Sequence, residues 1–172
     1  MVDSASRPND GREAVFLALG SNLGRRRVWI EQARQVLARR GVGMVRCSSL
    51  YDTAPREVVD QPRFLNQVCQ VECRLPPLRL LETCLQVERE LGRSRGKEKG
   101  PRNIDIDVIY YGERIIDHPR LKLPHPRLQE RAFVLVPLAE IAPQFADPRT
   151  GRTAAQMLRE PGVGDETLQP LS

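Results

Sequence analysis

The stretch Ile104–Tyr111, IDIDVIYY, alternates along its length and predicts a β-strand that organises both the fold and the site. Side chains two residues apart on a strand point to the same side of the sheet. One face of this strand then carries Asp105, Asp107 and Ile109, and the other carries Ile104, Ile106, Val108 and Tyr110. The second face is apolar and is expected to pack on a core. The two carboxylates are left side by side, roughly 6.5–7 Å apart at the backbone.

The segments around this strand alternate between strand-like and helix-like patterns. We expect strands at 14–19, 42–50 and 65–73, the last half-buried, a hairpin strand at 114–117, a loop at 53–63, and helices at 25–40, 76–91, 127–141 and 154–159. Strand, helix, strand, strand, helix, strand is the order of the split βαβ arrangement. The sequence therefore predicts an α+β, ferredoxin-like fold, a mostly antiparallel sheet with helices packed on it.

Length and composition indicate one domain. The chain has 172 residues, 40% of them hydrophobic, and a formal net charge of +5. We expect a disordered leader over 1–13, a single domain over 14–160 and a flexible tail over 161–172. The chain has no run of about 18 apolar residues and no signal-peptide pattern. We therefore expect a cytoplasmic protein without a membrane partner, with its four cysteines reduced.

The pair Asp105 and Asp107 indicates a metal site. Two carboxylates on a half-apolar strand repel one another, and a hard cation removes that repulsion. Mg²⁺ accepts one or two carboxylates and completes its octahedron with phosphate oxygens and water, and two ions can be bridged in such a site. On the pair alone, the solvent-facing side of an edge strand explains the pattern equally well.

A basic segment directly precedes the acidic pair. It contains Arg93, Arg95, Lys97, Lys99 and Arg102, with Gly92 before them and Gly96 and Gly100 between them. A flexible, guanidinium-rich loop beside a metal site suits triphosphate chemistry, although a solvated charged turn is the simpler alternative. The glycine spacing fits neither a Walker A motif nor a dinucleotide fingerprint. The cysteine and histidine spacing does not fit a zinc site.

The ordered motifs of the chain carry a resemblance to a known family. They are Leu19–Gly24 (LGSNLG), Ser48–Pro55 (SSLYDTAP), Gln61–Asn66 (QPRFLN), Gly92–Arg95 (GRSR), Gly100–Asp107 (GPRNIDID), Leu123–Pro126 (LPHP) and Arg131–Leu135 (RAFVL). In this order the chain resembles the 6-hydroxymethyl-7,8-dihydropterin pyrophosphokinase (HPPK) family. The resemblance implies transfer of pyrophosphate from ATP to the hydroxymethyl group of a reduced pterin in folate biosynthesis, with release of AMP.

The resemblance also implies roles for individual residues. It assigns Asp105 and Asp107 to Mg²⁺, with two ions expected, and Arg93 and Arg102 to catalysis on the phosphates. It assigns the pterin to Thr53, Ala54, Phe64, Asn66 and Phe133. It assigns ATP to Glu88, Arg95, Val108, Arg120, Lys122, His125 and Arg131. The chain departs from the family pattern at Lys99, where a tryptophan is frequent, and at Pro126, which is often aromatic.

Two other functions fit the predicted fold. One is an RNA-binding ferredoxin-like module, and the other is a nucleotide-binding domain without turnover. Aromatic residues make up only 5% of the chain, and no predicted strand carries the exposed aromatic pair on which RNA bases stack. We therefore expect small-molecule partners only and no nucleic acid, and the resemblance implies a monomer.

Overall fold

The computed structural model describes residues 3–55, 60–92, 103–164 and 168–171. The elements follow in the order β1 (Val15–Ser21), α1 (Arg26–Arg39), β2 (Val42–Cys47), β3 (Tyr51–Thr53), β4 (Phe64–Cys73), α2 (Pro77–Glu90), β5 (Asp105–Tyr111), β6 (Ile116–Asp117), β7 (Lys122–Leu123), a 3-10 helix (Leu128–Glu130), α3 (Ala132–Ile141) and α4 (Ala154–Leu158). The predicted mixture of antiparallel sheet and helices is confirmed. The short strand β3 was missed, since Tyr51 and Asp52 lie between the strand predicted at 42–50 and the loop predicted at 53–63, and Thr53 begins that loop.

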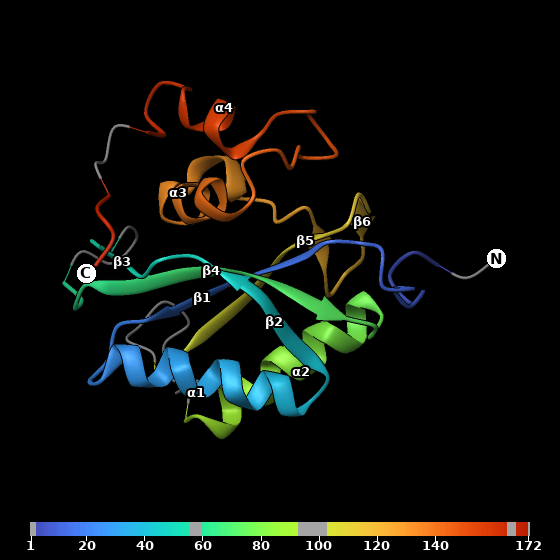
Figure 1. Cartoon of the computed structure of the whole chain (residues 1–172), viewed down its shortest axis with the longest axis horizontal. Helices are drawn as coiled ribbons and strands as arrows, with labels where there is room; N and C mark the ends of the chain where they lie inside the picture. The colour runs from blue at the N-terminus through green and yellow to red at the C-terminus, as the bar shows by residue number, and fades with distance from the viewer. Residues whose placement is uncertain (1–2, 56–59, 93–102, 165–167, 172) are drawn as a thin grey trace.

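The sheet is five-stranded, with the order β2-β4-β1-β5 and with β3 paired to β4. All of its pairings are antiparallel. Helices α1 and α2 cover one face, and α3 and α4 lie over the other (Figure 1). The central strand β1 is therefore bordered by β4 on one side and β5 on the other, and these three strands form the sheet side of the site.

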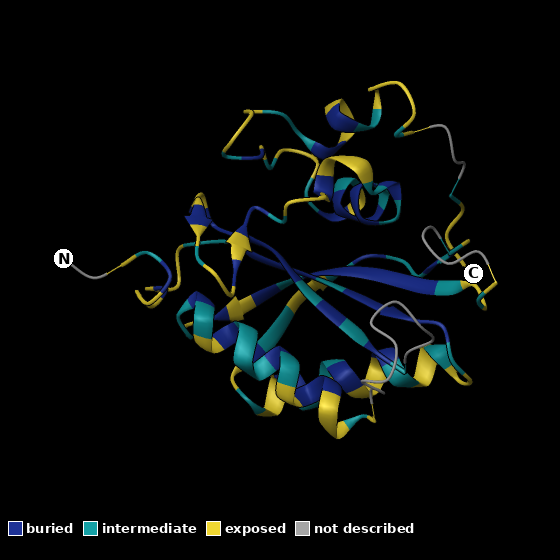
Figure 2. Cartoon of the chain, turned by 180° about the vertical axis from the view of Figure 1, so that it is seen from behind, coloured by how far each residue is buried: buried dark blue, intermediate teal, exposed yellow. Residues whose placement is uncertain are grey.

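Both faces of the sheet are buried, each in its own apolar cluster. Leu17 and Leu19 of β1 pack on the side of α1 and α2, whereas Phe16 of β1 and Val68 of β4 pack under α3. Strand β4 was predicted to be half-buried because its residues alternate in polarity. That prediction is wrong, because α3 covers the second face and buries most of the strand (Figure 2).

A register shift in β5 changes the face of one predicted residue. Leu17 pairs with Val108 while Phe16 pairs with Tyr110, so Ile109 lies in an irregularity of the ladder. An extra residue reverses the alternation beyond it. Tyr110 therefore joins Ile109 in the cluster under α3 instead of sharing the face of Ile106. The predicted hairpin also differs, because β6 pairs with β7.

The N-terminal segment was predicted to be disordered, but residues 3–13 have a defined path. The buried Arg114 guanidinium donates hydrogen bonds to the carbonyl oxygens of Ser4, Arg7 and Pro8 and forms an ion pair with Glu13. A guanidinium has five fixed donors, so one side chain binds four residues of the segment. In the predicted flexible tail, the Leu171 amide donates to the Leu50 carbonyl at 2.7 Å. No described helix is long and apolar enough to cross a membrane.

Candidate active site

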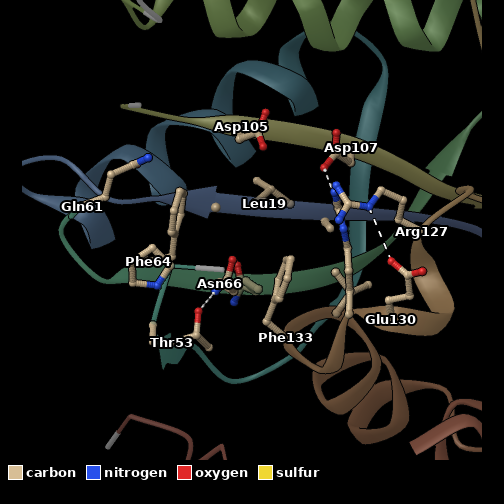
Figure 3. Close-up of a pocket in the computed structure, with 17 residues that line it drawn as sticks. Leu19, Thr53, Gln61, Phe64, Asn66, Asp105, Asp107, Arg127, Glu130 and Phe133 are labelled. Carbon is tan, nitrogen blue, oxygen red and sulfur yellow. Dashed lines mark hydrogen bonds and ion pairs between the residues drawn. The ribbon is translucent and has the colours of Figure 1, made fainter. Parts of the chain in front are cut away.

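A cavity of about 150 Å³ opens on the α3 side of the sheet. Its floor is formed by β1, its sides by the starts of β4 and β5, and its cover by the chain leading into α3 (Figure 3). The residues that line it are Ala18, Leu19, Gly20, Thr53, Ala54, Pro55, Gln61, Phe64, Asn66, Gln67, Asp105, Asp107, Arg127, Glu130, Arg131, Phe133 and Val134. Eight of these were predicted as site residues: Thr53, Ala54, Phe64, Asn66, Asp105, Asp107, Arg131 and Phe133.

Strand register explains why an amide and two carboxylates meet in one cavity. Gly20 pairs with Asn66 on one side and with Asp105 on the other. Ala18, two residues earlier on the same face, pairs with Val68 and with Asp107. Opposite residues on neighbouring strands point to the same face. The small residues Gly20 and Ala18 thus form a low floor between the side chains of β4 and β5.

The amide half of the cavity consists of Thr53, Phe64, Asn66 and Phe133. The Asn66 amide nitrogen donates to the Thr53 hydroxyl at 2.5 Å, and both residues are buried. A Cβ on Gly20 would lie 3.0 Å from the Asn66 amide oxygen, so the absence of a side chain at Gly20 lets Asn66 take this place. A buried amide that is fixed in this way offers a donor and an acceptor in one plane.

Two aromatic rings border the amide half. Phe64 and Phe133 lie on opposite sides of Asn66 in Figure 3. Phe64 begins β4, whereas Phe133 comes from the first turn of α3. Both rings are only partly buried, and the Arg131 guanidinium lies 5.6 Å from the centre of the Phe133 ring. A flat heteroaromatic ring gains by stacking on the faces of such rings.

The acidic half consists of Asp105, Asp107, Arg127 and Arg131, which lie at the other end of the cavity. Asp105 and Asp107 are partly exposed and line the same cavity, as the alternation of the strand predicted. The Arg131 guanidinium lies 3.8 Å from the Asp107 carboxylate, and Arg127 lies 3.6 Å from Glu130. Acids and guanidinium groups in this arrangement suit phosphate oxygens and a hard cation.

The acidic half matches the ligand preferences of Mg²⁺. Two carboxylates on one face, open to the cavity, match an ion that takes one or two carboxylates and leaves its other positions to phosphate and water. Among the described residues, no group of three or more His, Cys, Asp or Glu could hold a metal by itself. The residues therefore fit a metal that arrives with a phosphate ligand and do not form a closed structural site.

His125 lies beside the acidic half without lining the cavity. Its backbone N–H donates to the Ile109 carbonyl at 3.1 Å, and its ring Nδ1 accepts from the Arg127 amide at 3.2 Å. Burial, followed by the charge of Arg131, lowers the pKa of His125 to about 4, although Asp105 acts in the opposite direction. The imidazole is therefore neutral at physiological pH.

The other residues predicted for ATP lie away from the cavity lining. Glu88 is buried, and its carboxylate accepts from the Ile106 amide at 2.8 Å; it supports β5 from the α2 side. Val108 packs in the core on that side as well. Arg120 pairs with Glu82, and Lys122 pairs with Asp117. The predicted Arg93, Arg95 and Arg102, together with Lys99, lie outside the described residues.

Several lining residues were not predicted from the sequence. They are Ala18, Leu19, Gly20, Pro55, Gln61, Gln67, Arg127, Glu130 and Val134. Gly20 and Gln61 belong to motifs that were recognised as blocks, so their positions carried a usable signal. The contribution of Arg127 and Glu130 to the cavity could not be predicted, because it depends on the path of the chain between β7 and α3. No local sequence pattern specifies that path.

Comparison with known proteins identifies the family. Residues 16–143 match the family model for 7,8-dihydro-6-hydroxymethylpterin-pyrophosphokinase (HPPK). The chain is 42% identical over 147 residues to the 2-amino-4-hydroxy-6-hydroxymethyldihydropteridine pyrophosphokinase of Pseudomonas aeruginosa, covering 85% of this chain and 90% of that protein. The enzyme of the same name from Bacillus subtilis is 40% identical over 83% of this chain and 86% of its own length.

Other relatives are much longer than this chain. The folic acid synthesis protein fol1 of Pneumocystis carinii is 40% identical over 92% of this chain, but the match spans only 21% of that protein. A match to the mitochondrial folate synthesis bifunctional protein of Arabidopsis thaliana spans 24% of that protein. The chain thus covers about a fifth to a quarter of the length of these relatives.

The fold is shared with solved structures. A crystal structure of an HPPK-DHPS protein in complex with substrates superposes with a TM-score of 0.69 at 14% sequence identity, covering 86% of this chain and 43% of that one. Wild-type HPPK-DHPS of Plasmodium falciparum gives a TM-score of 0.64 at 15% identity, covering 84% and 44%. With the family match over residues 16–143 and the sequence identity to two bacterial enzymes, the chain belongs to the HPPK family.

Proposed function

We propose that this chain transfers the pyrophosphoryl group of ATP to 6-hydroxymethyl-7,8-dihydropterin, giving the pterin diphosphate and AMP. The observation that carries the proposal is the row Asn66–Gly20–Asp105 across three strands. It gives one cavity an amide for a heterocycle at one end and carboxylates for a metal-bound phosphate at the other. Membership of the HPPK family supports the same reaction.

The amide half binds the pterin in this proposal. Asn66 faces the ring edge with its donor and acceptor, and Thr53 holds the amide in that orientation. Phe64 and Phe133 stack on the two faces of the ring. Ala54 contacts the pterin through its backbone. The hydroxymethyl group then lies toward Asp105 and Asp107, where the phosphates of ATP are bound.

The acidic half aligns the phosphates. Bound at Asp105 and Asp107 together with ATP, Mg²⁺ supplies charge neutralisation and orientation of the β- and γ-phosphates. The Arg131 guanidinium, already 3.8 Å from Asp107, reaches phosphate oxygens beside the carboxylates. Arg93 and Arg102, by resemblance, stabilise the charge that develops during transfer.

The chemical step requires no covalent intermediate on the protein. The pterin hydroxyl oxygen forms a bond to the β-phosphorus, and the bond from the β-phosphorus to the bridging oxygen of the α-phosphate breaks. AMP leaves with that oxygen, and the hydroxyl proton passes to solvent. Alignment of the two substrates in one cavity supplies much of the rate.

We also propose a ferredoxin-like fold, a monomeric state and a cytoplasmic location. The order β2-β4-β1-β5, with a helix in each of two crossovers, supports the ferredoxin-like description. We propose that the protein acts as a monomer, as the resemblance to the HPPK family implies. We place the protein in the cytoplasm, where reduced pterin and ATP are available to it.

A single assay tests the proposed reaction. The full chain, mixed with ATP, Mg²⁺ and the reduced hydroxymethylpterin, should release AMP in proportion to the pterin consumed. Pterin without ATP, and ATP without pterin, serve as blanks. AMP formation no faster than in the blanks would refute the proposal. Nucleotide binding without AMP would instead support the domain without turnover.

The RNA-binding alternative is not favoured. Its fold would place stacking aromatics on an open sheet face, whereas α3 and α4 cover the face that carries Phe64 (Figure 1). Phe64 and Phe133 instead border a bounded cavity. Family membership points in the same direction.

A further inference from the structure

An ion-pair cluster of Arg26, Asp52 and Arg63, here called the Asp52 cluster, lies next to the cavity without lining it. Arg63 Nε donates to Asp52 Oδ1 at 2.7 Å, and Arg26 Nη2 donates to Asp52 Oδ2 at 3.1 Å. Arg63 Nη2 reaches the Asp52 carbonyl at 3.2 Å, and Arg26 Nη1 reaches the Arg63 carbonyl at 3.0 Å. The one carboxylate therefore joins β3, the start of β4 and the start of α1.

Two of the three members of the cluster are adjacent in sequence to part of the site. Asp52 precedes Thr53, and Arg63 precedes Phe64. Thr53 and Phe64 are themselves opposite each other in the β3–β4 ladder. The cluster thus secures the last pair of that ladder from the outside, while the same pair lines the cavity on the inside.

The β3–β4 ladder needs such support because it is short. Only three residues of β3 pair with β4, and a ladder of that length is weak by itself. The chain between β3 and β4 is also held from β1, because the Asn22 amide donates to the Gln61 side chain at 3.0 Å and to the Pro62 carbonyl at 3.3 Å. Gln61 lines the cavity, so both attachments act on the same wall.

The electrostatics of the cluster agree with this geometry. Burial acts to raise the pKa of Asp52, but the hydrogen bonds from Arg26 and Arg63 outweigh burial, and the pKa is lowered. The carboxylate therefore stays charged at neutral pH. Its side chain is 27% exposed, so its interactions remain sensitive to salt.

We propose that Asp52 is a positioning residue for the pterin, which acts with Arg26 and Arg63 by fixing Thr53 and Phe64 at the spacing that Asn66 requires. The proposal rests on the proposed pyrophosphokinase function. It predicts an effect limited to one substrate. The cluster holds the wall of the amide half, whereas Asp105, Asp107 and Arg131 belong to other segments.

The test compares four forms of the full chain in steady-state assays of AMP release: wild type, Asp52→Asn, Arg63→Asp, and the double variant Asp52→Arg/Arg63→Asp. Asp52→Asn keeps the shape and removes the charge, and should raise the KM for the pterin about tenfold. The KM for ATP and kcat should stay within about twofold. Arg63→Asp should act in the same direction, because it places two carboxylates together.

The double variant restores a pair of opposite charges at the same two positions. Arg26 already contacts the Arg63 carbonyl, so it can pair with an aspartate there. The KM for the pterin should return to within about threefold of the wild-type value, since the interaction is rebuilt and not removed. Glu160→Gln, which breaks the Arg152–Glu160 pair on the far side of α3, is the matched control and should leave both KM values unchanged.

Salt provides a second measurement that a general loss of structure would not reproduce. At about 1 M ionic strength, where the Debye length is about 3 Å, the wild-type KM for the pterin at saturating ATP should approach that of Asp52→Asn. The variant itself should change less. The melting temperature of each form is measured in parallel. If Asp52→Asn does not fold, Arg63→Gln removes half of the contacts and carries the same comparison.

The outcomes separate the two proposals. An unchanged pterin KM in Asp52→Asn, or an equal rise in both KM values, would overturn the positioning role while leaving the pyrophosphokinase function intact. Failure of the double variant to recover would also count against it. Absence of AMP with the wild-type chain would refute the reaction itself.

Discussion

The two halves of the cavity differ in how deeply their polar side chains are buried and how closely these side chains contact one another. In the amide half, Asn66 is 7% exposed, Thr53 is 2% exposed, and a hydrogen bond of 2.5 Å joins their side chains. In the acidic half, the Asp107 side chain is 36% exposed, and its contact with Arg131 is 3.8 Å long. The amide half is preorganised, whereas in the acidic half the charged groups of Asp107 and Arg131 are more exposed and farther apart.

The difference follows from the ligands that the halves are proposed to bind. A neutral heterocycle is recognised by donors and acceptors, which must be fixed and desolvated to discriminate. Phosphates bring their own charge and cations, so partly exposed carboxylates and guanidinium groups suit them without being fixed in advance. Substitutions in the amide half should therefore affect the affinity for one substrate, and those in the acidic half should affect the rate.

The largest effect is expected from Asp107→Ala. If the two carboxylates bind the transferred phosphate as proposed, removal of one should lower kcat by about 10²–10³-fold or more, measured as AMP release at saturating substrates. The exposed pair Asp10 and Arg12 offers a control, and Asp10→Ala should keep wild-type kcat. A fully active Asp107→Ala variant would remove the acidic half from the reaction.

A smaller and more selective effect is expected from Asn66→Ala. The substitution leaves the buried Thr53 hydroxyl unpaired and removes the amide, a loss of about 1–3 kcal/mol. The KM for the pterin should rise roughly 10- to 100-fold, because each 1.4 kcal/mol is a factor of ten. The KM for ATP, measured in the same titrations, should not rise. A parallel rise in both values would show that the two halves are not separable.

A subtler disturbance of the amide half is expected from Gly20→Ala. The added Cβ would lie 3.0 Å from the Asn66 amide oxygen and 3.7 Å from the Phe64 ring. Relief of the first contact displaces the amide by a few tenths of an ångström. We expect about a three- to tenfold rise in the KM for the pterin, equivalent to about 1 kcal/mol. Ala18→Gly, on the same face of β1, is the comparison and should be milder.

A pH-dependent effect is expected on the stability of the region beside the acidic half. The pKa of His125 is lowered to about 4, first by burial and then by Arg131, with Arg127 and Arg149 acting in the same direction and Asp105 opposing them. The unfolded chain therefore binds more protons than the folded one between about pH 6.5 and 4, so stability should fall as the pH falls through that window. Above about pH 6.5, His125 should not contribute to the change of stability with pH.

The comparison is made with His125→Asn. Thermal melts of wild type and variant from pH 7 to pH 4 should show a steeper decline for the wild-type chain. Identical slopes would mean that His125 titrates normally and that the region around the acidic half is more open than the structure shows.

Prediction from the sequence succeeded where the signal was local. Alternation in β5 correctly placed Asp105 and Asp107 on one side, and apolar spacing found α1 and α2. It failed at Tyr110, because a single irregular residue reverses the alternation, and at β3, because a three-residue strand has no periodicity to detect. It also failed at the N-terminal segment, whose order depends on Arg114, and the Arg114–Glu13 contact joins residues 101 positions apart.

The sequence by itself determined which side chains share a face within each strand and helix, and its ordered motifs indicated the HPPK family. Only the tertiary structure decided that β1 lies between β4 and β5, which puts Gly20 between Asn66 and Asp105. It also decided that Asp52 joins three segments from outside the cavity. The physical reason is that periodicity is a property of neighbouring residues, whereas strand register and ion pairs depend on contacts that form only when distant segments pack together.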